Sequence, residues 1–289
     1  MNAAGHPPPP PLVSVVVPTR NEARNIEPCL RSFDAAVAAG WCETLVVDNA
    51  SDDRTAELAG QCGARVFRQG PERSAQRNRG WREARGVFVF FLDADMRVPA
   101  ATLAEIHARL LADDPPDALY VREVRVGGGW WIRVRNFERS FYDATCIDGL
   151  RVIRRGLLAE VGGYDEALYA CEDWDLDRRL LARTARVALT DTALAHDEGA
   201  FRLRRHLRKK AYYAGNFDAY LGKWGRDAVT RRQFGLWYRF AGVFLERGKW
   251  RRACRHPLLM AAIGFDRALV GAVCLLERAR RPRRGGECA

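Results

Sequence analysis

The first third of the chain alternates short β-branched runs with longer stretches of helical period, and this alternation constrains the fold more than any other feature. Helix-period segments at 22–38, 53–60 and 72–84 separate the runs. Continuous apolar strands suit a sheet covered on both faces, and repeated βα units imply parallel pairing. The pattern predicts an α/β fold with a Rossmann-like, mostly parallel central sheet flanked by helices. The expected strands are LVSVVV (12–17), TLVVD (44–48), ARVF (64–67) and VFVFFL (87–92).

Changes in composition divide the chain into three expected regions. MNAAGHPPPPP predicts a disordered, proline-rich lead over residues 1–11, without the pattern of a signal peptide. The α/β domain is expected over 12–200. Beyond it, RLRRHLRKKAYYAG (202–215) is basic and aromatic, so a basic, helical C-terminal extension is expected over 201–289.

Composition and charge narrow the class of protein. The 289 residues are 48% hydrophobic and 29% charged, which is typical of a globular protein. A net charge of +11 favours an anionic partner, such as a nucleotide, a sugar phosphate or an anionic membrane. No nucleic-acid-binding motif is present, so no nucleic acid is expected as a partner. The cysteines form no CxxC pair, which argues against structural zinc and for reduced thiols in the cytoplasm.

Three polar, acid-bearing clusters follow predicted strands: PTRNE (18–22), DNASDD (48–53) and DADMR (93–97). Ligands of such sheets gather at the carboxyl ends of the strands, so the three clusters indicate one site. Asp93 and Asp95 can converge on a hard cation such as Mg²⁺ or Mn²⁺. The alternative is a loop with two solvated aspartates.

Two other enzyme classes fit these motifs less well. Phosphatases of the haloacid dehalogenase type also place DxD after an apolar strand, but that strand opens the domain and the motif ends in Thr or Val. Here Met96 follows the motif and three strands precede it. A Rossmann oxidoreductase would carry GxGxxG after its first strand, where this chain has PTRNE.

Four segments, in this order, resemble the family 2 glycosyltransferases of the GT-A fold and together cover roughly 12–198. The resemblance implies an inverting, metal-dependent enzyme that uses Mn²⁺ or Mg²⁺ and a UDP- or GDP-sugar donor. The acceptor would be a hydroxyl group or a lipid phosphate, in the synthesis of cell-envelope glycans or glycolipids. The segments are VSVVVPTRNEARNI (13–26), LVVDNASDDRT (45–55), GPERSAQRNRGWREARGVFVFFLDADMR (70–97) and GGYDEALYACEDWDLDRRL (162–180).

The resemblance also implies roles for single residues. Asp95 is the expected metal ligand, Asp93 is shared between metal and ribose, and His196 is either a further ligand or structural. Asp48 and Asn49 are expected where the family holds the base. Many relatives have a second Asp where this chain has Asn49, so the choice between uracil and guanine stays open. Arg73 and Arg77 are expected near the diphosphate, unless they lie on a solvated helix face. The residues expected to bind the nucleotide sugar are Pro18, Thr19, Arg20, Glu22, Asp48, Asn49, Arg73, Asp93 and Asp95.

Inversion requires a base that takes the proton of the acceptor hydroxyl. The resemblance places Asp173 in that role, with Glu172 next in line. The alternative is an acidic first turn of a helix, which the helix dipole favours. We adopt that alternative for Asp175 and Asp177.

The C-terminal extension predicts peripheral association with the cytoplasmic face of a membrane. Its basic and aromatic segment 202–213 and its apolar segment 257–276 suit an anionic membrane surface. Asp266 and Arg267 lie in the middle of the apolar segment and disfavour a spanning helix. The alternative function is that of a basic nucleotide-, nucleic-acid- or membrane-binding protein on the same scaffold, without transferase activity.

Overall fold

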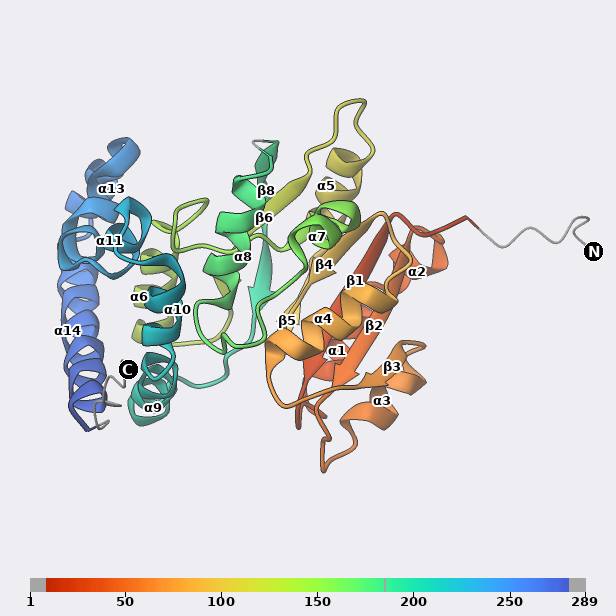
Figure 1. Cartoon of the computed structure of the whole chain (residues 1–289), viewed down its shortest axis with the longest axis horizontal. Coiled ribbons are helices and arrows are strands. Elements are labelled where there is room, and N and C mark those ends of the chain that lie inside the picture. The colour runs from red at the N-terminus through yellow and green to blue at the C-terminus, as the bar shows by residue number, and fades with distance from the viewer. Residues whose placement is uncertain (1–8, 185, 281–289) are drawn as a thin grey trace, which may run out of the picture. The chain divides into compact units, whose positions relative to one another are not determined.

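The computed structural model describes residues 9–184 and 186–280, which form two compact units (Figure 1). The sheet unit comprises Met1–Val124, Gly149–Glu166 and Asp175–Asp197. The helical unit comprises Arg125–Asp148, Ala167–Trp174 and Glu198–Ala289. Residues 1–8 of the expected proline-rich lead lie outside the described residues. The expected boundary near residue 200 stays a prediction.

The sheet unit is built on an eight-stranded sheet of order β3-β2-β1-β4-β7-β6-β8-β5. The four strands predicted from the sequence pair in parallel, and the later strands pair antiparallel. The predicted α/β class, with a sheet flanked by helices, is thereby confirmed. The strands are β1 (Val13–Thr19), β2 (Cys42–Asp48), β3 (Arg65–Arg68), β4 (Phe88–Phe91), β5 (Met96–Arg97), β6 (Ala118–Arg125), β7 (Val152–Arg154) and β8 (Val187–His196).

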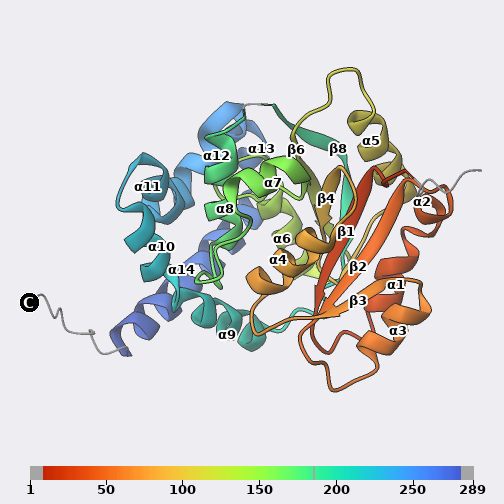
Figure 2. The same ribbon diagram turned by 45° about the vertical axis from the view of Figure 1, so that its right-hand side comes forward.

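Helices cover both faces of the parallel strands. Figure 2 shows α1, α2 and α3 on one side of β1–β3 and α4 on the other. Alternate residues of β1, such as Val15 and Val17, pack with Ile26 of α1 and Ile106 of α5 in one core, which is the burial that the apolar strand pattern requires. The helices are α1 (Ile26–Arg31), α2 (Asp34–Ala38), α3 (Thr55–Gln61), α4 (Arg73–Glu83), α5 (Ala100–Leu110), α7 (Arg155–Val161) and α8 (Glu172–Leu181).

The helical unit has its own apolar core, in which Phe141, Phe244 and Ile263 are almost fully buried. It contains the predicted C-terminal helical region together with α6, which comes from an earlier segment. A π-helical turn, η1 (Tyr238–Gly242), interrupts the α-helices. The elements are α6 (Trp130–Arg139), α9 (Leu203–Ala214), α10 (Phe217–Trp224), α11 (Ala228–Phe234), η1, α12 (Val243–Leu245), the 3₁₀ turn η2 (Glu246–Gly248), α13 (Trp250–Cys254) and α14 (Pro257–Arg280).

Helix α14 combines an exposed apolar surface with a polar attachment to the rest of the helical unit. Its segment Pro257–Glu277 is long and apolar enough to cross a membrane, and only 11% of the most apolar window is buried. The two charged residues in its middle face other helices of the unit. Asp266 lies 3.3 Å from His206 of α9, and Arg267 donates to Glu138 of α6 at 2.9 Å.

Candidate functional site

The carboxyl ends of β1 and β2 are tied together by buried polar side chains. Thr19 donates to Asp48 at 3.2 Å, and the backbone N–H of Ser51 donates to the same carboxylate at 2.9 Å. The amide of Gln76, on α4, donates to the carbonyls of Thr19 and Val47. Asp48 therefore shapes the loop after β2 with both of its oxygens, and its expected contact with the base stays a prediction.

The other residues expected around the nucleotide surround this edge of the sheet. Pro18 is buried in β1, and Arg20 is exposed just beyond it. Glu22 accepts a hydrogen bond from the Asn25 amide at 2.7 Å. Asn49 donates to the carbonyl of Pro71 at 2.5 Å and lies so close to Gly70 that a Cβ there would be 2.2 Å from its side-chain oxygen.

Asp93, the first carboxylate of the DxD pair, forms an ion pair with Arg77 of α4 at 3.2 Å. Burial would raise the pKa of Asp93, but the positive charges of Arg77, Arg73 and Arg151 hold it well below its usual range. Arg77, the other arginine expected near the diphosphate, is 4% exposed, so it does not lie on a solvated helix face. Arg73, which was expected near the diphosphate, lies half-buried one helical turn before it. The structure thus gives Asp93 an internal cationic partner.

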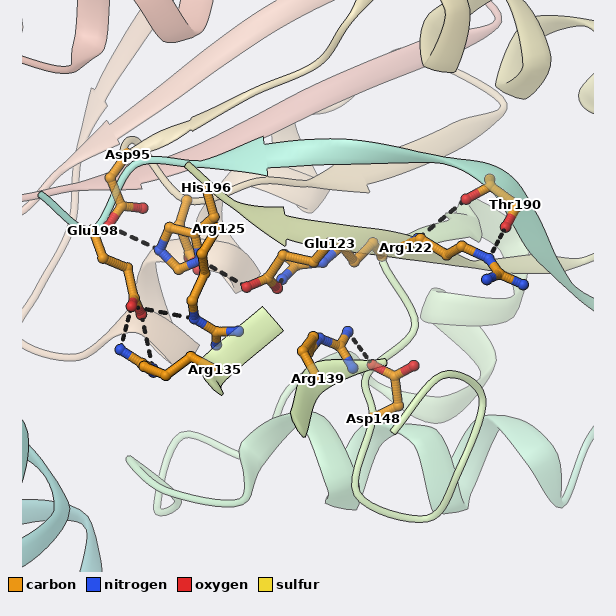
Figure 3. A network of polar contacts seen from close by, with 12 residues as sticks. Asp95, Arg122, Glu123, Arg125, Arg135, Arg139, Asp148, Thr190, His196 and Glu198 are labelled. Carbon is orange, nitrogen blue, oxygen red and sulfur yellow. Dashed lines mark hydrogen bonds and ion pairs between the residues drawn. The ribbon is translucent and has the colours of Figure 1, made fainter. Parts of the chain in front are cut away.

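Asp95, the second carboxylate, meets His196 across the sheet (Figure 3). The antiparallel pairing of β5 with β8 sets Met96 opposite His196, which brings the histidine Nε2 to 3.2 Å from an Asp95 oxygen. The other ring nitrogen, Nδ1, lies 2.8 Å from Glu123. Glu123 in turn accepts from Arg151 at 3.0 Å. A continuous polar chain therefore leads from the DxD loop into the interior of the sheet unit.

The acidic side chains around His196 favour the charged form of its imidazole. Burial lowers the pKa of His196, but its hydrogen bonds to Asp95 and Glu123 outweigh burial and raise the pKa to about 9. The sequence singled out Asp95 and His196, which the structure brings together. It did not identify Glu123 or Arg151. Neither lies in a recognisable motif, and only the three-dimensional pairing of β6 and β8 with the DxD loop reveals their role.

Asp173, the expected base, and its neighbour Glu172 begin α8 within the helical unit. Glu172 is almost fully buried and Asp173 is half-buried. The residue before them, Cys171, adopts φ 61°, in the left-handed region that non-glycine residues rarely occupy. Such conformations cost free energy and cluster at functional sites.

Asp175 and Asp177 of α8 belong to the sheet unit and are engaged there. Asp175 is bound by Arg179 one turn later at 2.6 Å. Asp177 accepts from the Tyr120 hydroxyl and from the backbone N–H of Leu150, both at 2.9 Å. These contacts anchor the helix.

Cation binding depends on how many suitable side chains converge. Within 9–184 and 186–280, no three His, Cys, Asp or Glu side chains are grouped as they would be in a complete metal cage. The seven described cysteines are free thiols. Asp95 and His196 offer one oxygen and one nitrogen donor. That donor set fits Mn²⁺ or Mg²⁺ that retains water or phosphate ligands.

Comparisons with known proteins find two family models. The model described as "Glycosyl transferase family 2" matches residues 14–162, and "Glycosyltransferase like family 2" matches 142–238. The PGL/p-HBAD biosynthesis glycosyltransferase of Mycobacterium bovis is 27% identical over 186 residues, which are 61% of this chain and 72% of that protein. The dolichol-phosphate mannosyltransferase of Pyrococcus furiosus is 34% identical over 100 residues, 32% of this chain and 28% of that protein.

Solved structures resemble most of the chain in fold. The mannosyltransferase PcManGT of Pyrobaculum calidifontis, in complex with GDP-Man and Mn²⁺, aligns with a TM-score of 0.58 at 20% identity, covering 94% of this chain and 76% of that one. S. aureus TarS 1-349 aligns with a TM-score of 0.52 at 19% identity, covering 94% and 93%. These similarities confirm the fold predicted from the sequence, including its helical C-terminal region.

Proposed function

The chain belongs to glycosyl transferase family 2, and from this premise we propose that it is an inverting, metal-dependent enzyme that uses a UDP- or GDP-sugar. The observation that carries the proposal is the convergence of Asp95 and His196 at 3.2 Å beside the carboxyl edge of the sheet. A binding protein without chemistry would not require an imidazole held on one side by the DxD loop and on the other by Glu123.

The proposed metal ligands are Asp95 and His196, whose imidazole would release its Nε2 proton when the cation binds. Glu123 holds the Nδ1 side of the ring at 2.8 Å and so keeps Nε2 directed at Asp95, as partners of metal-bound histidines do. Asp93, paired with Arg77, is proposed as the ribose contact and as a shared ligand. A bound Mn²⁺ or Mg²⁺ would neutralise negative charge on the leaving diphosphate. The Mn²⁺ bound with GDP-Man in PcManGT supports this choice of metal.

The nucleotide pocket is proposed at the ends of β1 and β2. The hydrogen bonds of Asp48 and Gln76 fix the backbone of both strand ends, and a rigid edge is what a nucleotide site needs. Asn49 can both donate and accept, so it is compatible with either base. The residues proposed to contact the donor are Pro18, Thr19, Arg20, Glu22, Asp48, Asn49, Arg73, Asp93 and Asp95.

Asp173 is the proposed base, with Glu172 beside it. The strained Cys171 and the start of α8 fix the backbone at this pair. Asp173 would accept the proton of the acceptor hydroxyl while the acceptor oxygen attacks the anomeric carbon. Because the base acts on the acceptor, its loss should affect transfer more than donor binding.

The helical unit is proposed to associate with the cytoplasmic face of a membrane, where an acceptor glycan or lipid would be reached. Leu236, Trp237 and Leu258 are each more than 70% exposed, and exposed apolar side chains of this size are typical of interaction surfaces. The contacts of Asp266 and Arg267 with α9 and α6 hold the middle of α14 against its own unit. These contacts favour a helix that lies at the membrane surface over one that spans it.

The test is a screen of UDP-, GDP- and dTDP-sugars for manganese-dependent binding, slow hydrolysis and transfer. Asp95→Asn should weaken manganese-dependent nucleotide binding at least tenfold, because it removes an anionic ligand. Asp173→Asn should bind the donor as the wild type does and lose transfer. Asp113→Asn, at an exposed position on the loop after α5, is the matched control.

Two results would overturn the proposal: that no nucleotide sugar binds, or that Asp95→Asn behaves like the wild type. Full transfer by Asp173→Asn would remove this residue from the base role. Binding of a nucleotide sugar that is never consumed, in every variant and in the wild type, would favour the alternative of a binding protein.

A further inference from the structure

Three tyrosines of the helical unit form a connected row of aromatic rings. The ring centroids of Tyr169 and Tyr212 lie 5.0 Å apart with the rings tilted by 39°, and Tyr213 lies 5.6 Å from Tyr212. Tyr169 belongs to the loop before α8, whereas the other two belong to the last turn of α9. Centroid distances of about 4.5–7 Å are typical of interacting aromatic rings. The row therefore joins two segments that are far apart in the sequence.

The row is open to solvent at Tyr212. This residue is 50% exposed, and Tyr169 and Tyr213 are half-buried. Tyr220 of α10 provides a contrast, because it packs against Phe234 of α11 at 5.9 Å between centroids and is fully buried. Tyr220 completes the interior of the unit, whereas the row presents an aromatic surface to solvent.

A buried asparagine fixes the backbone that carries Tyr169. Asn216, just before α10, is 6% exposed. Its side-chain oxygen accepts from the backbone N–H groups of Tyr169 and Ala170 at 2.9 and 3.1 Å. Its amide donates to the carbonyl of Ala167 at 3.2 Å. Because Asn216 follows α9 by two residues, it ties the loop of Tyr169 to the end of the helix that carries Tyr212.

The row lies near the proposed base. Tyr169 precedes Asp173 by four residues, and both belong to the helical unit. An extended chain advances at most about 3.6 Å per residue, so the two Cα atoms lie within about 14 Å of each other. A short oligosaccharide spans such a distance. An acceptor whose hydroxyl group meets Asp173 can therefore bring another of its sugar rings to the row.

We infer that Tyr169 and Tyr212 form a stacking platform for a sugar ring of the acceptor, which is then a glycan or glycolipid that already carries sugar. The inference rests on the proposed function, because it takes Asp173 as the acceptor-facing base. One face of a pyranose ring carries weakly positive C–H groups, and the face of an aromatic ring is negative. Tyrosine also offers a large, rigid contact area at a low cost in conformational entropy.

Two cations beside Tyr212 supply polar contacts for the same sugar. Arg208 and Lys209 precede Tyr212 by four and three residues on α9, a spacing that places all three side chains on one helix face. Both are exposed, and their N–H groups can donate to sugar hydroxyls. A membrane surface would also attract these cations, but it does not require rings held in a fixed row. The row therefore favours a sugar over a lipid headgroup.

Saturation-transfer NMR of the full chain tests the platform with the methyl glycosides of mannose, glucose, galactose and N-acetylglucosamine. At least one should bind, with the strongest saturation on the C–H protons of one ring face. Tyr212→Leu keeps an apolar side chain but removes the ring, and it should weaken glycoside binding about two- to tenfold. Tyr212→Phe keeps the ring and should bind as the wild type does. Trp250→Leu, at a residue of α13 that is 48% exposed, is the matched control and should also bind normally.

Four results would overturn the platform. They are that no glycoside binds to the wild type, that Tyr212→Leu binds as well as the wild type, that Tyr212→Phe loses as much affinity as Tyr212→Leu, and that Trp250→Leu does so. Co-sedimentation with vesicles of phosphatidylcholine and phosphatidic acid is a second arm, in which Tyr212→Leu should behave like the wild type. Loss of vesicle binding in this variant with unchanged glycoside binding would assign Tyr212 to the membrane instead.

Failure of the platform and failure of the proposed function are distinguishable. Manganese-dependent nucleotide binding should stay within twofold of the wild type in Tyr212→Leu, and a larger loss would assign the ring to the donor and overturn the inference. Glycoside binding that depends on Tyr212, in a protein that turns over no nucleotide sugar, would uphold the platform and reject the transferase.

Discussion

At the scale of single residues, Glu123 contacts Nδ1 of His196, the ring nitrogen on the side away from Asp95. It is 9% exposed and bound by Arg151, so it holds its position while it contacts His196 Nδ1 at 2.8 Å. Removing such an outer partner commonly lowers metal affinity about 10–100-fold. Glu123→Gln should therefore raise the manganese concentration needed for half-maximal nucleotide binding by about that factor.

A manganese titration of nucleotide binding checks this prediction, because excess metal should restore binding in Glu123→Gln. A purely structural role of Glu123 would instead give a defect that manganese does not restore. Glu160→Gln, an exposed change on α7, is the control. Unchanged manganese dependence in Glu123→Gln would show that Glu123 does not position His196.

The residues of the site differ in how far the sequence could predict them. Asp93, Asp95 and His196 lie next to strand ends, where local pattern and family resemblance mark them. Glu123 lies in the middle of a β-rich stretch, and nothing local distinguishes it from a solvated acid. Its role depends on β6 and β8 meeting, which is a contact between residues 73 positions apart.

At the scale of elements, Glu105 of α5 joins its helix to β8. It accepts from the backbone N–H groups of Asp191 and Thr192 at 2.7 and 2.9 Å, and from Arg109 at 2.8 Å. Burial raises the pKa of Glu105, but these hydrogen bonds and that of the Thr192 hydroxyl lower it to about 2. The carboxylate is therefore favoured in the folded state.

The lowered pKa of Glu105 fixes how the free energy of unfolding depends on pH. The ionised Glu105 stabilises the folded state fully above its unfolded pKa, about 4.5, and this stabilisation is lost as the pH falls towards 2. Since one pKa unit corresponds to about 1.4 kcal/mol, Glu105→Gln should lower the free energy of unfolding by about 2–3 kcal/mol at pH 7. Urea unfolding at pH 7 and pH 3 checks this. A deficit of equal size at both values would contradict the assignment.

The elements themselves were predictable where the pattern is local. The parallel strands β1 to β4 each carry their own apolar run, and each was expected within two residues of its observed bounds. The antiparallel strands β5 and β7 have two and three residues. Runs that short carry too little periodicity for a prediction, and they form because longer neighbours hold them in register.

At the scale of the whole molecule, exposed apolar side chains on the helical unit predict binding to anionic vesicles. Leu236 and Trp237 are 76% and 73% exposed, and burying a large apolar side chain contributes about 1.5–3 kcal/mol. The double variant Leu236→Ser/Trp237→Ser should weaken binding to vesicles at least tenfold in co-sedimentation. Salt should weaken it further, because basic residues such as Arg231 and Arg232 add screened attraction.

Leu111→Ser is the matched control, since Leu111 is 60% exposed but belongs to the sheet unit. It should bind vesicles as the wild type does. An equal effect of Leu111→Ser, or binding of the wild type that neither salt nor the double variant changes, would contradict a membrane surface on the helical unit.

Two segments of the helical unit could not be foreseen from the sequence. Composition changes after His196, which suggested a linear boundary near residue 200. The helical unit also takes in Arg125–Asp148 and Ala167–Trp174. The amino-acid composition does not distinguish these two segments from the sheet unit around them, because each has the apolar content of an ordinary helix or loop.

The pairing of β5 with β8 has a consequence for biosynthesis. Met96 and His196 are opposite each other in the sheet although a hundred residues separate them. A nascent chain that has left the ribosome only as far as the DxD loop carries both carboxylates but not the histidine that meets Asp95. The cation site that we propose would therefore arise late in translation, after the nucleotide edge of β1 and β2 has been synthesised.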